Sequence, residues 1–399
     1  MNKSAKAHSL MATEYREVAM QNTQNFNTYL AYIDSSKYHF EKALEIYPAY
    51  SNCLNNLGVL YHVNMQKTWE EIPLFRKAIE VKKDYHQANH SLGTCYAKVI
   101  GATDFINNSL QFIKIDSSAK GSTNLTINQD VFISASYAKM IYDMVIKTLQ
   151  TKGEAVYNTA NHSAILKEIQ NSINQFLVLE NSYLKLSFNF SSELYEPLNK
   201  AFGMFTPESY QKTFEAIDKG IQYKFGVFYA DLISKQLKLN SYEQADQLFY
   251  TINDQRKIYV DSAMIFYESA MKIDSLNPIY YDDFIAFLHK EKKEKEFVKA
   301  NVNTINSAPL KNKIQYFLNL ANYYIYKQDL ENGLTYINQG IEHANKVKVD
   351  LQKNTELEKS VVLKDTKTIQ DALKIFYQLG YQIHTAKGNT SEADKFVKL

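Results

Sequence analysis

Three histidines come closest, by type and spacing, to a metal site. His86 and His90 are four residues apart, which places two imidazoles on one face of a helix, and His62 is expected on a neighbouring helix. No glutamate follows the first histidine as in the zinc-protease pattern, and no third ligand has a characteristic spacing. We therefore interpret all three as ordinary surface or groove histidines, and we predict no metal and no cofactor.

Two adjacent glutamates are the other candidate for chemistry. Glu70 and Glu71 follow Trp69, which suggests a carboxylate pair for work on sugars. Neighbouring carboxylates on a helix project in different directions, however, so they cannot flank one bond. Thr68 and Glu71 instead match a capping box that opens a helix, with Pro73 close behind. Because the chain also lacks a Gly-rich phosphate loop and a Gly-x-Ser-x-Gly elbow, we predict that it is not an enzyme.

Charge and cysteine content exclude further classes of protein. Lys and Arg number 45 against 43 Asp and Glu, so no net field recruits nucleic acid. The run 289–296 alternates in sign, which is typical of a solvated helix end. Cys53 and Cys95 are too few for a disulfide framework or a zinc site and are expected to pack inside helices.

Apolar runs long enough for a membrane span or a signal peptide are missing from the sequence. We expect a soluble chain without direct membrane insertion and of unknown compartment. The alternative that it is a fragment of a membrane-anchored protein stays open.

The elements that position these residues are expected to be helices. Only 12 Gly and 6 Pro leave few turn-formers for a sheet-rich fold, while 45% hydrophobic residues are ample for a core. Residues 55–61 are echoed by residues 90–96 with a step of 35, the length of one helix-turn-helix unit. Residues 75–81 supply the second helix between the two copies.

Further copies flank these two. Upstream, residues 8–15 form a first helix whose partner carries Ser36, Phe40 and Ala43, with about twelve extra residues inserted near 21–31. Downstream, small and large apolar residues keep the unit's spacing without a gap at Leu320, Ala321, Tyr324, Gly333, Ile337 and Gly340. Partial copies are present at Ala263, Tyr267 and Ala270 and at Gly388, Ala393 and Val397. Gly or Ala at these points lets paired helices approach closely.

This pattern resembles the tetratricopeptide repeat (TPR) family. The resemblance implies an all-α fold, a right-handed superhelix of antiparallel helix pairs. Residues 1–116 would be N-terminal repeats with an insertion in the first pair, and residues 221–399 C-terminal repeats. The signature fades in residues 117–220, where helical periodicity persists at 137–146, so we expect diverged helical pairs there.

In this family the first helix of each pair lines a concave groove that holds extended peptides. Carried over by position, the partner-binding residues would be Asn52, Asn55, Asn56, Val59, His62, Gln87, His90, Ser91, Thr94, Lys98 and Asn319. Asn56 and Asn319 occupy the sixth position of their units, which resembles the asparagine ladder of the O-GlcNAc transferase repeats. Amides donate and accept, so such a wall suits peptide backbone.

We therefore predict a non-enzymatic protein-protein interaction scaffold that binds a peptide or protein of unknown identity in its groove. Two alternatives stay open. The junction at residues 3–8 resembles that of bacterial protein O-mannosyltransferase-like membrane proteins, which implies the soluble C-terminal repeat region of a larger glycosyltransferase-like protein. A glycan-binding surface protein ranks lowest, because such sites commonly stack sugars on Trp and the chain has one.

Overall fold

A computed structural model of the chain describes residues 3–65, 68–118, 120, 129–152, 237–307, 313–353 and 359–397, with single residues and runs of two or three between 160 and 234. Regular structure in these described residues is helical throughout, with no strand. The predicted all-α class is therefore confirmed. No helix in the described ranges combines the length and the apolar character that crossing a membrane requires.

Two compact units divide the chain, Met1–Phe266 (unit 1) and Tyr267–Leu399 (unit 2). Helix α10 (Tyr242–Ile273) contains the boundary. Unit 1 otherwise holds α1 (Lys3–Gln21), α2 (Phe26–Ile46), α3 (Ser51–Val59), the π-helix η1 (Leu60–Met65), α4 (Thr68–Val81), α5 (His86–Leu110) and α6 (Gln129–Lys152). Unit 2 holds α11 (Pro278–Lys290), α12 (Glu294–Ser307), α13 (Lys313–Tyr326), α14 (Leu330–Lys353), α15 (Lys359–Ala386), α16 (Thr390–Ala393) and the 3₁₀-helix η4 (Asp394–Phe396).

The predicted middle segment is mostly beyond the described residues. Within 117–220, α6 confirms the helix expected at 137–146. The three-part division at 116 and 220, and the right-handed superhelix, stay predictions.

The 35-residue repeat is visible in the turns between successive helix pairs of unit 1. Tyr47 N–H donates to Ala43 O at 2.9 Å, and 35 residues later Lys82 N–H donates to Ala78 O at 2.9 Å. Tyr50 and Tyr85 then precede the next helices with nearly equal backbone angles, φ −84° and −87°. The sequence repeat is therefore a repeat of backbone geometry.

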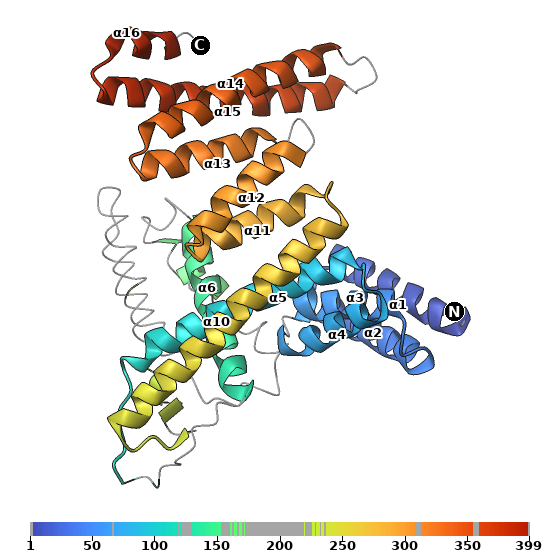
Figure 1. The fold of residues 1–399 in the computed structure, drawn as a ribbon. Helices are drawn as coiled ribbons and strands as arrows, with labels where there is room; N and C mark the ends of the chain where they lie inside the picture. The colour runs from blue at the N-terminus through green and yellow to red at the C-terminus, as the bar shows by residue number, and fades with distance from the viewer. Residues whose placement is uncertain are drawn as a thin grey trace. The chain divides into compact units, whose positions relative to one another are not determined.

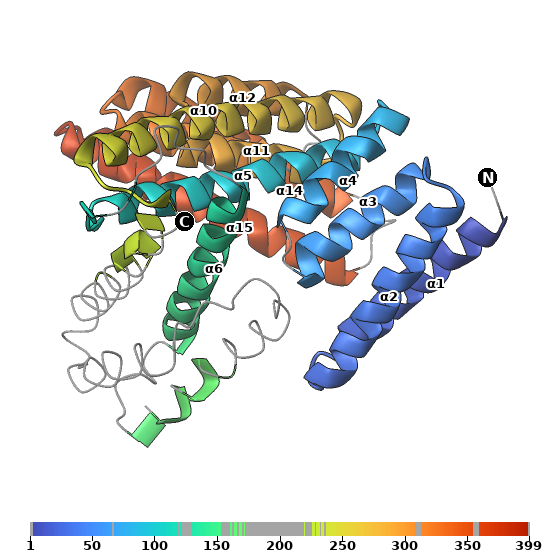
Figure 2. The same ribbon diagram turned by 90° about the horizontal axis from the view of Figure 1, so that it is seen from below.

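The extra residues of the first helix pair, α1 and α2, lengthen its helices. Helices α1 and α2 pack side by side over their length (Figures 1 and 2). They are joined by the short turn 22–25, where Asn25 Oδ1 accepts from Thr28 N–H at 3.2 Å and caps α2. Most of the segment 21–31, expected as an insertion between the helices, is helix in the structure.

Close helix approach occurs where the glycines predicted it. A Cβ built on Gly58 of α3 would lie 2.7 Å from Cε1 of Phe75 of α4, and Phe75 is fully buried. In unit 2, a Cβ on Gly340 of α14 would overlap the ring of Phe376 of α15. At both crossings the aromatic ring fills the space that the absent side chain leaves.

Helix α10 packs on α5 although some 150 residues of sequence separate their contacts (Figures 1 and 2). Arg256 Nε donates to Asp104 Oδ1 at 2.5 Å, and Asn107 Nδ2 donates to Asn253 Oδ1 at 3.0 Å. Tyr96 stacks on Tyr259, with ring centroids 6.0 Å apart. Helix α5, the first helix of the third pair, is therefore covered by a helix that comes much later in the sequence.

The three pairs of unit 2 share one turn. In each, the second residue after the first helix has positive φ, namely Lys292 (53°), Gln328 (61°) and Gly388 (72°). The next residue's N–H bonds back to the helix, as Lys293 does to Leu288 O at 2.9 Å. This is the Schellman closure, in which a left-handed residue lets orphan carbonyls be satisfied. The alternating run 289–296 is therefore a helix end, as predicted, continuing through a turn into α12.

Candidate functional site

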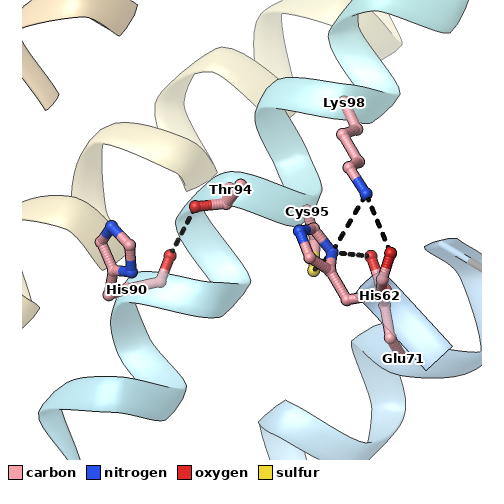
Figure 3. Close-up of polar contacts among 6 residues, drawn as sticks. All are labelled: His62, Glu71, His90, Thr94, Cys95 and Lys98. Atoms are coloured by element: carbon pink, nitrogen blue, oxygen red, sulfur yellow. Dashed lines mark hydrogen bonds and ion pairs between the residues drawn. The ribbon is translucent and has the colours of Figure 1, made fainter. Parts of the chain in front are cut away.

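A polar cluster joins three consecutive helical elements of unit 1. We call it the His62 cluster; it comprises His62 of η1, Glu71 of α4, and Cys95 and Lys98 of α5 (Figure 3). The side chain of Glu71 is fully buried, as is Cys95, whereas that of His62 is 18% exposed. A carboxylate without solvent contact requires strong compensation from its neighbours.

Most of the contacts in the cluster converge on one atom, Nδ1 of His62. It lies 2.9 Å from Glu71 Oε1, 3.2 Å from Lys98 Nζ and 3.9 Å from Cys95 Sγ. Lys98 Nζ also donates to the backbone carbonyl of His62 at 3.4 Å. Oε2 of Glu71 is buried and has no hydrogen-bond partner among the described residues.

The structure corrects the interpretation of Glu71 as a capping residue. Helix α4 begins at Thr68, as expected. The carboxylate of Glu71, however, contacts His62. Glu71 lies on the face of α4 that packs toward η1 and α5, so burial of that face brings the carboxylate to the histidine.

The three histidines that the sequence analysis weighed as a metal site, and rejected, do not come together. Among the described residues, the group of potential metal ligands that comes together is His62, Glu71 and Cys95, whose ligand atoms all lie within 4.8 Å of one another. His86 and His90 are not members. In Figure 3, His90 lies a turn and more away along α5, and its backbone carbonyl accepts from Thr94 Oγ1 at 3.2 Å. The four-residue spacing of His86 and His90 therefore brings neither of them to His62.

Burial is the main cause of the pKa shifts in the cluster. Burial raises the pKa of the Cys95 thiol well above its ordinary value, and the neighbouring Glu71 carboxylate adds to the rise. Burial lowers the pKa of Lys98, while the Glu71 carboxylate opposes that shift. Lys98 is therefore the nearby cation that offsets the Glu71 charge, and the thiol stays protonated unless further positive charge arrives.

The predicted partner-binding residues of unit 1 differ in accessibility. Asn52 and Gln87 are exposed, and Asn56, Val59, His90, Ser91 and Thr94 are half-buried. Asn55 is buried, with its Nδ2 3.4 Å from Asn56 Oδ1, so a ligand reaches it less readily. First helices of neighbouring pairs are bridged by polar contacts, such as Arg16 Nε to Asn64 Oδ1 at 3.0 Å. Binding by these residues stays a prediction.

A second candidate is a groove in unit 2 of about 960 Å³, built mainly from the first helices of three successive pairs. Helices α11, α13 and α15 contribute nearly all of its walls, and Asn319 lies among them. Its lining residues are Pro278, Asp282, Ile285, Ala286, His289, Phe297, Ile314, Gln315, Tyr316, Leu318, Asn319, Asn322, Tyr323, Tyr326, Asp365, Thr368, Ile369 and Ala372.

Polar side chains of this groove are held in place by hydrogen bonds and can still form further ones. Asn319 Nδ2 donates to Asn301 Oδ1, and its Oδ1 accepts from Gln315 Nε2, both at 3.1 Å. An amide has two N–H groups and two lone pairs, so each of these contacts uses half of the capacity of its atom. Tyr316 Oη donates to Asp282 Oδ1 at 2.9 Å and bridges α13 to α11. Lys and Arg are missing from the described lining, which carries two aspartates.

Comparisons with known proteins place the chain near no named family. No protein-family model matches it, and no curated protein matches it. Among solved structures it aligns with yeast Tom70 at 12% identity, covering 96% of this chain and 90% of that chain, with a TM-score of 0.19. A human IFIT1 dimer with m7Gppp-AAAA aligns at 10% identity, covering 100% and 90%, with a TM-score of 0.23.

The TPR domain of P58(IPK) aligns at 12% identity, covering 91% of this chain and 98% of that chain, with a TM-score of 0.19. Because all these scores are low, the all-α fold of helix pairs rests on this chain's own helices. The resemblance to O-mannosyltransferase-like proteins finds no support in these comparisons.

Proposed function

We propose that the chain is a non-enzymatic interaction scaffold whose unit 2 holds an extended peptide in the groove between α11, α13 and α15. The observation that carries the proposal is that the groove is built mainly from the first helices of three successive pairs. Such stacking presents a continuous wall longer than any single helix pair, which suits a linear ligand.

The chemistry of the wall favours a particular class of peptide. Half-used amides at Gln315 and Asn319 match the alternating N–H and C=O groups of an extended backbone. Tyr323 and Tyr326 offer aromatic area with a polar tip, which suits apolar side chains at a wet interface. Asp282 and Asp365, with no Lys or Arg in the described lining, favour a ligand that carries a basic residue.

Selection from a library of random linear peptides displayed on phage tests the proposal with the full-length chain. We expect enriched peptides to contain Lys or Arg beside an apolar residue, and to bind with an affinity measurable by fluorescence anisotropy. Asn319→Ala should weaken binding about tenfold, because loss of one well-placed hydrogen bond costs about 1–1.5 kcal/mol. Asp365→Asn should weaken basic peptides and spare neutral ones.

Asn338→Ala is the matched control, since Asn338 is an exposed asparagine of the second helix α14 and is not in the groove. Failure to enrich any peptide, or equal binding by the Asn319→Ala and Asn338→Ala variants, would count against the groove. An RNA competitor belongs in the same assay, because the absence of a nucleic-acid partner is itself a prediction.

No specific observation favours the two other hypotheses, a glycan-binding protein and a part of a glycosyltransferase-like protein. Trp69, the one tryptophan, is half-buried: it lies edge-on to Tyr259 at 6.5 Å between centroids and packs against a core cluster, so part of its surface is already in use. Membership in a larger membrane-embedded glycosyltransferase-like protein has no feature of the described residues in its favour. The scaffold therefore remains the function that the geometry supports best.

A further inference from the structure

The contacts around His62 exceed what hydrogen bonding alone can satisfy. An imidazole nitrogen has one in-plane direction, in which it either donates one N–H or accepts one hydrogen bond. Nδ1 of His62 nevertheless faces Glu71 Oε1 at 2.9 Å, Lys98 Nζ at 3.2 Å and Cys95 Sγ at 3.9 Å (Figure 3). At most one of these three atoms can be bonded well by the nitrogen.

A second, independent observation concerns the other carboxylate oxygen of Glu71. Its Oε2 is buried and without a hydrogen-bond partner among the described residues, on a side chain with no exposed surface. An orphaned carboxylate oxygen in the interior costs several times more than an ordinary buried polar group. Besides Lys98, the carboxylate has a histidine nitrogen and a thiol as neighbours, and both are groups that bind metal cations.

We propose that His62, Glu71 and Cys95 bind one zinc ion, with a fourth ligand supplied by solvent. Imidazole nitrogen, carboxylate oxygen and thiolate sulfur are the three ligand types that zinc takes in proteins. Tetrahedral zinc requires about 3.3 Å between nitrogen and oxygen and about 3.5 Å between nitrogen and sulfur, as follows from bond lengths of about 2.0 and 2.3 Å. The observed 2.9 and 3.9 Å lie within about half an ångström of those values.

Charge and protons balance in this step. The zinc–sulfur bond forms as the Cys95 thiol gives its proton to solvent, so thiolate and carboxylate together neutralise the two charges of the ion. The Lys98 ammonium, which offsets Glu71 without metal, moves aside and keeps its contact with the His62 carbonyl. The partial exposure of His62 leaves a side from which ion and water enter.

The site would act on the scaffold itself. Its ligands come from η1, α4 and α5, which are the first and second helices of one pair and the first helix of the next. Zinc would therefore fix the spacing between two neighbouring first helices, on the wall that carries His62 and Lys98. The π-helical η1, a rare conformation often found at functional sites, carries the histidine.

Metal titration of the full-length chain tests this assignment, after chelator treatment and under reducing conditions. Zinc binding is followed by calorimetry, and cobalt serves as a spectroscopic substitute whose thiolate-to-metal charge-transfer band reports the sulfur ligand. The variants are Cys95→Ser, His62→Gln and Glu71→Gln. Their matched controls are Cys53→Ser, which alters the other buried thiol, and His90→Gln.

We expect one zinc per chain, a charge-transfer band with cobalt, and a rise in the unfolding temperature on metal addition. Cys95→Ser should abolish the band, and Cys95→Ser and His62→Gln should each weaken binding at least about tenfold, since even outer partners of a ligand contribute about that much. Cys53→Ser and His90→Gln should bind as the wild type does. Far-ultraviolet circular dichroism checks that each variant folds, and Glu71→Gln and His62→Gln decide the matter if Cys95→Ser does not.

Three results would overturn the proposal. They are the absence of saturable binding by the wild type, a charge-transfer band that is lost in Cys53→Ser and retained in Cys95→Ser, and affinity unchanged in both His62→Gln and Glu71→Gln. The last of these would mean an adventitious ion only.

Discussion

Replacement of Gly340 by alanine tests the packing principle on which the helix pairs depend. Gly340 of α14 faces Phe376 of α15, whose ring is fully buried in the core cluster of unit 2. A Cβ at position 340 would overlap that ring. Because the ring is enclosed and rigid, either it leaves its rotamer or the two helices move apart.

The magnitude follows from two opposing effects. Overpacking of a well-filled core costs about 1–3 kcal/mol. Alanine in place of glycine in a helix interior stabilises the helix by about 0.5–1 kcal/mol. We therefore expect Gly340→Ala to lower the free energy of unfolding of unit 2 by about 1–2 kcal/mol.

Urea denaturation followed by circular dichroism measures this, in a double-mutant cycle with Phe376→Leu. In the leucine background the ring is gone, so the cost of Gly340→Ala should shrink by about 1–2 kcal/mol. Gly333→Ala is the control, because its new Cβ would meet the side-chain atom Ile325 Cγ1 at 3.2 Å. That side chain gives way more easily, and the expected change is within about 0.5 kcal/mol. A Gly340→Ala variant as stable as the wild type, or an equal cost in both backgrounds, would refute the reasoning.

Three further predictions concern two side-chain contacts and one backbone angle. His8 Nδ1 and His39 Nδ1 are 2.8 Å apart, and burial followed by the charge of His8 holds the pKa of His39 below its ordinary value. The unfolded chain then binds the proton more tightly, so stability should fall as pH drops through about 6.5, and His39→Gln should flatten that pH profile of the unfolding midpoint. Arg256→Lys removes the guanidinium that bonds Asp104; the two side chains of this ion pair are 29% and 37% exposed. The substitution should lower the free energy of unfolding by about 0.5–1 kcal/mol at low salt and by less at high salt, as measured by thermal unfolding. Gln328→Gly should stabilise by about 0.5–1 kcal/mol in chemical denaturation, because φ of 61° strains a residue with a side chain; a loss of stability would contradict that account.

Much of the fold could be predicted because the information is local. The echo of residues 55–61 at 90–96 indicated two successive helix pairs, and both are present with matching turns. Gly58 and Gly340 marked close crossings because glycine in a helix interior is unfavourable unless packing requires it. The turns at Lys292 and Gln328 were not predictable, since neither carries the glycine that normally signals a left-handed residue.

The candidate sites were predictable only in part. Asn319 lies in α13 and lines the groove of unit 2, while its part in binding stays a prediction. His62 was weighed with His86 and His90 as a metal site and that site was rejected, whereas the structure brings His62 to Glu71 and Cys95. The repeat itself was the one signal in the sequence that could have brought these elements together. A shift of 35 residues aligns the first helix that carries His62 with the first helix that carries Lys98, so the two helices are expected to be neighbours.

The helices, their pairing and the points where they touch could be predicted from the residues, since they follow from spacings within a turn or within one repeat. Tertiary structure alone decided that α10 covers α5, that a groove forms in unit 2, and that an imidazole, a carboxylate and a thiol meet at one point. Such convergence depends on crossing angles and rotamers of helices remote in sequence. No periodicity along the chain encodes those quantities, and only the packed core fixes them.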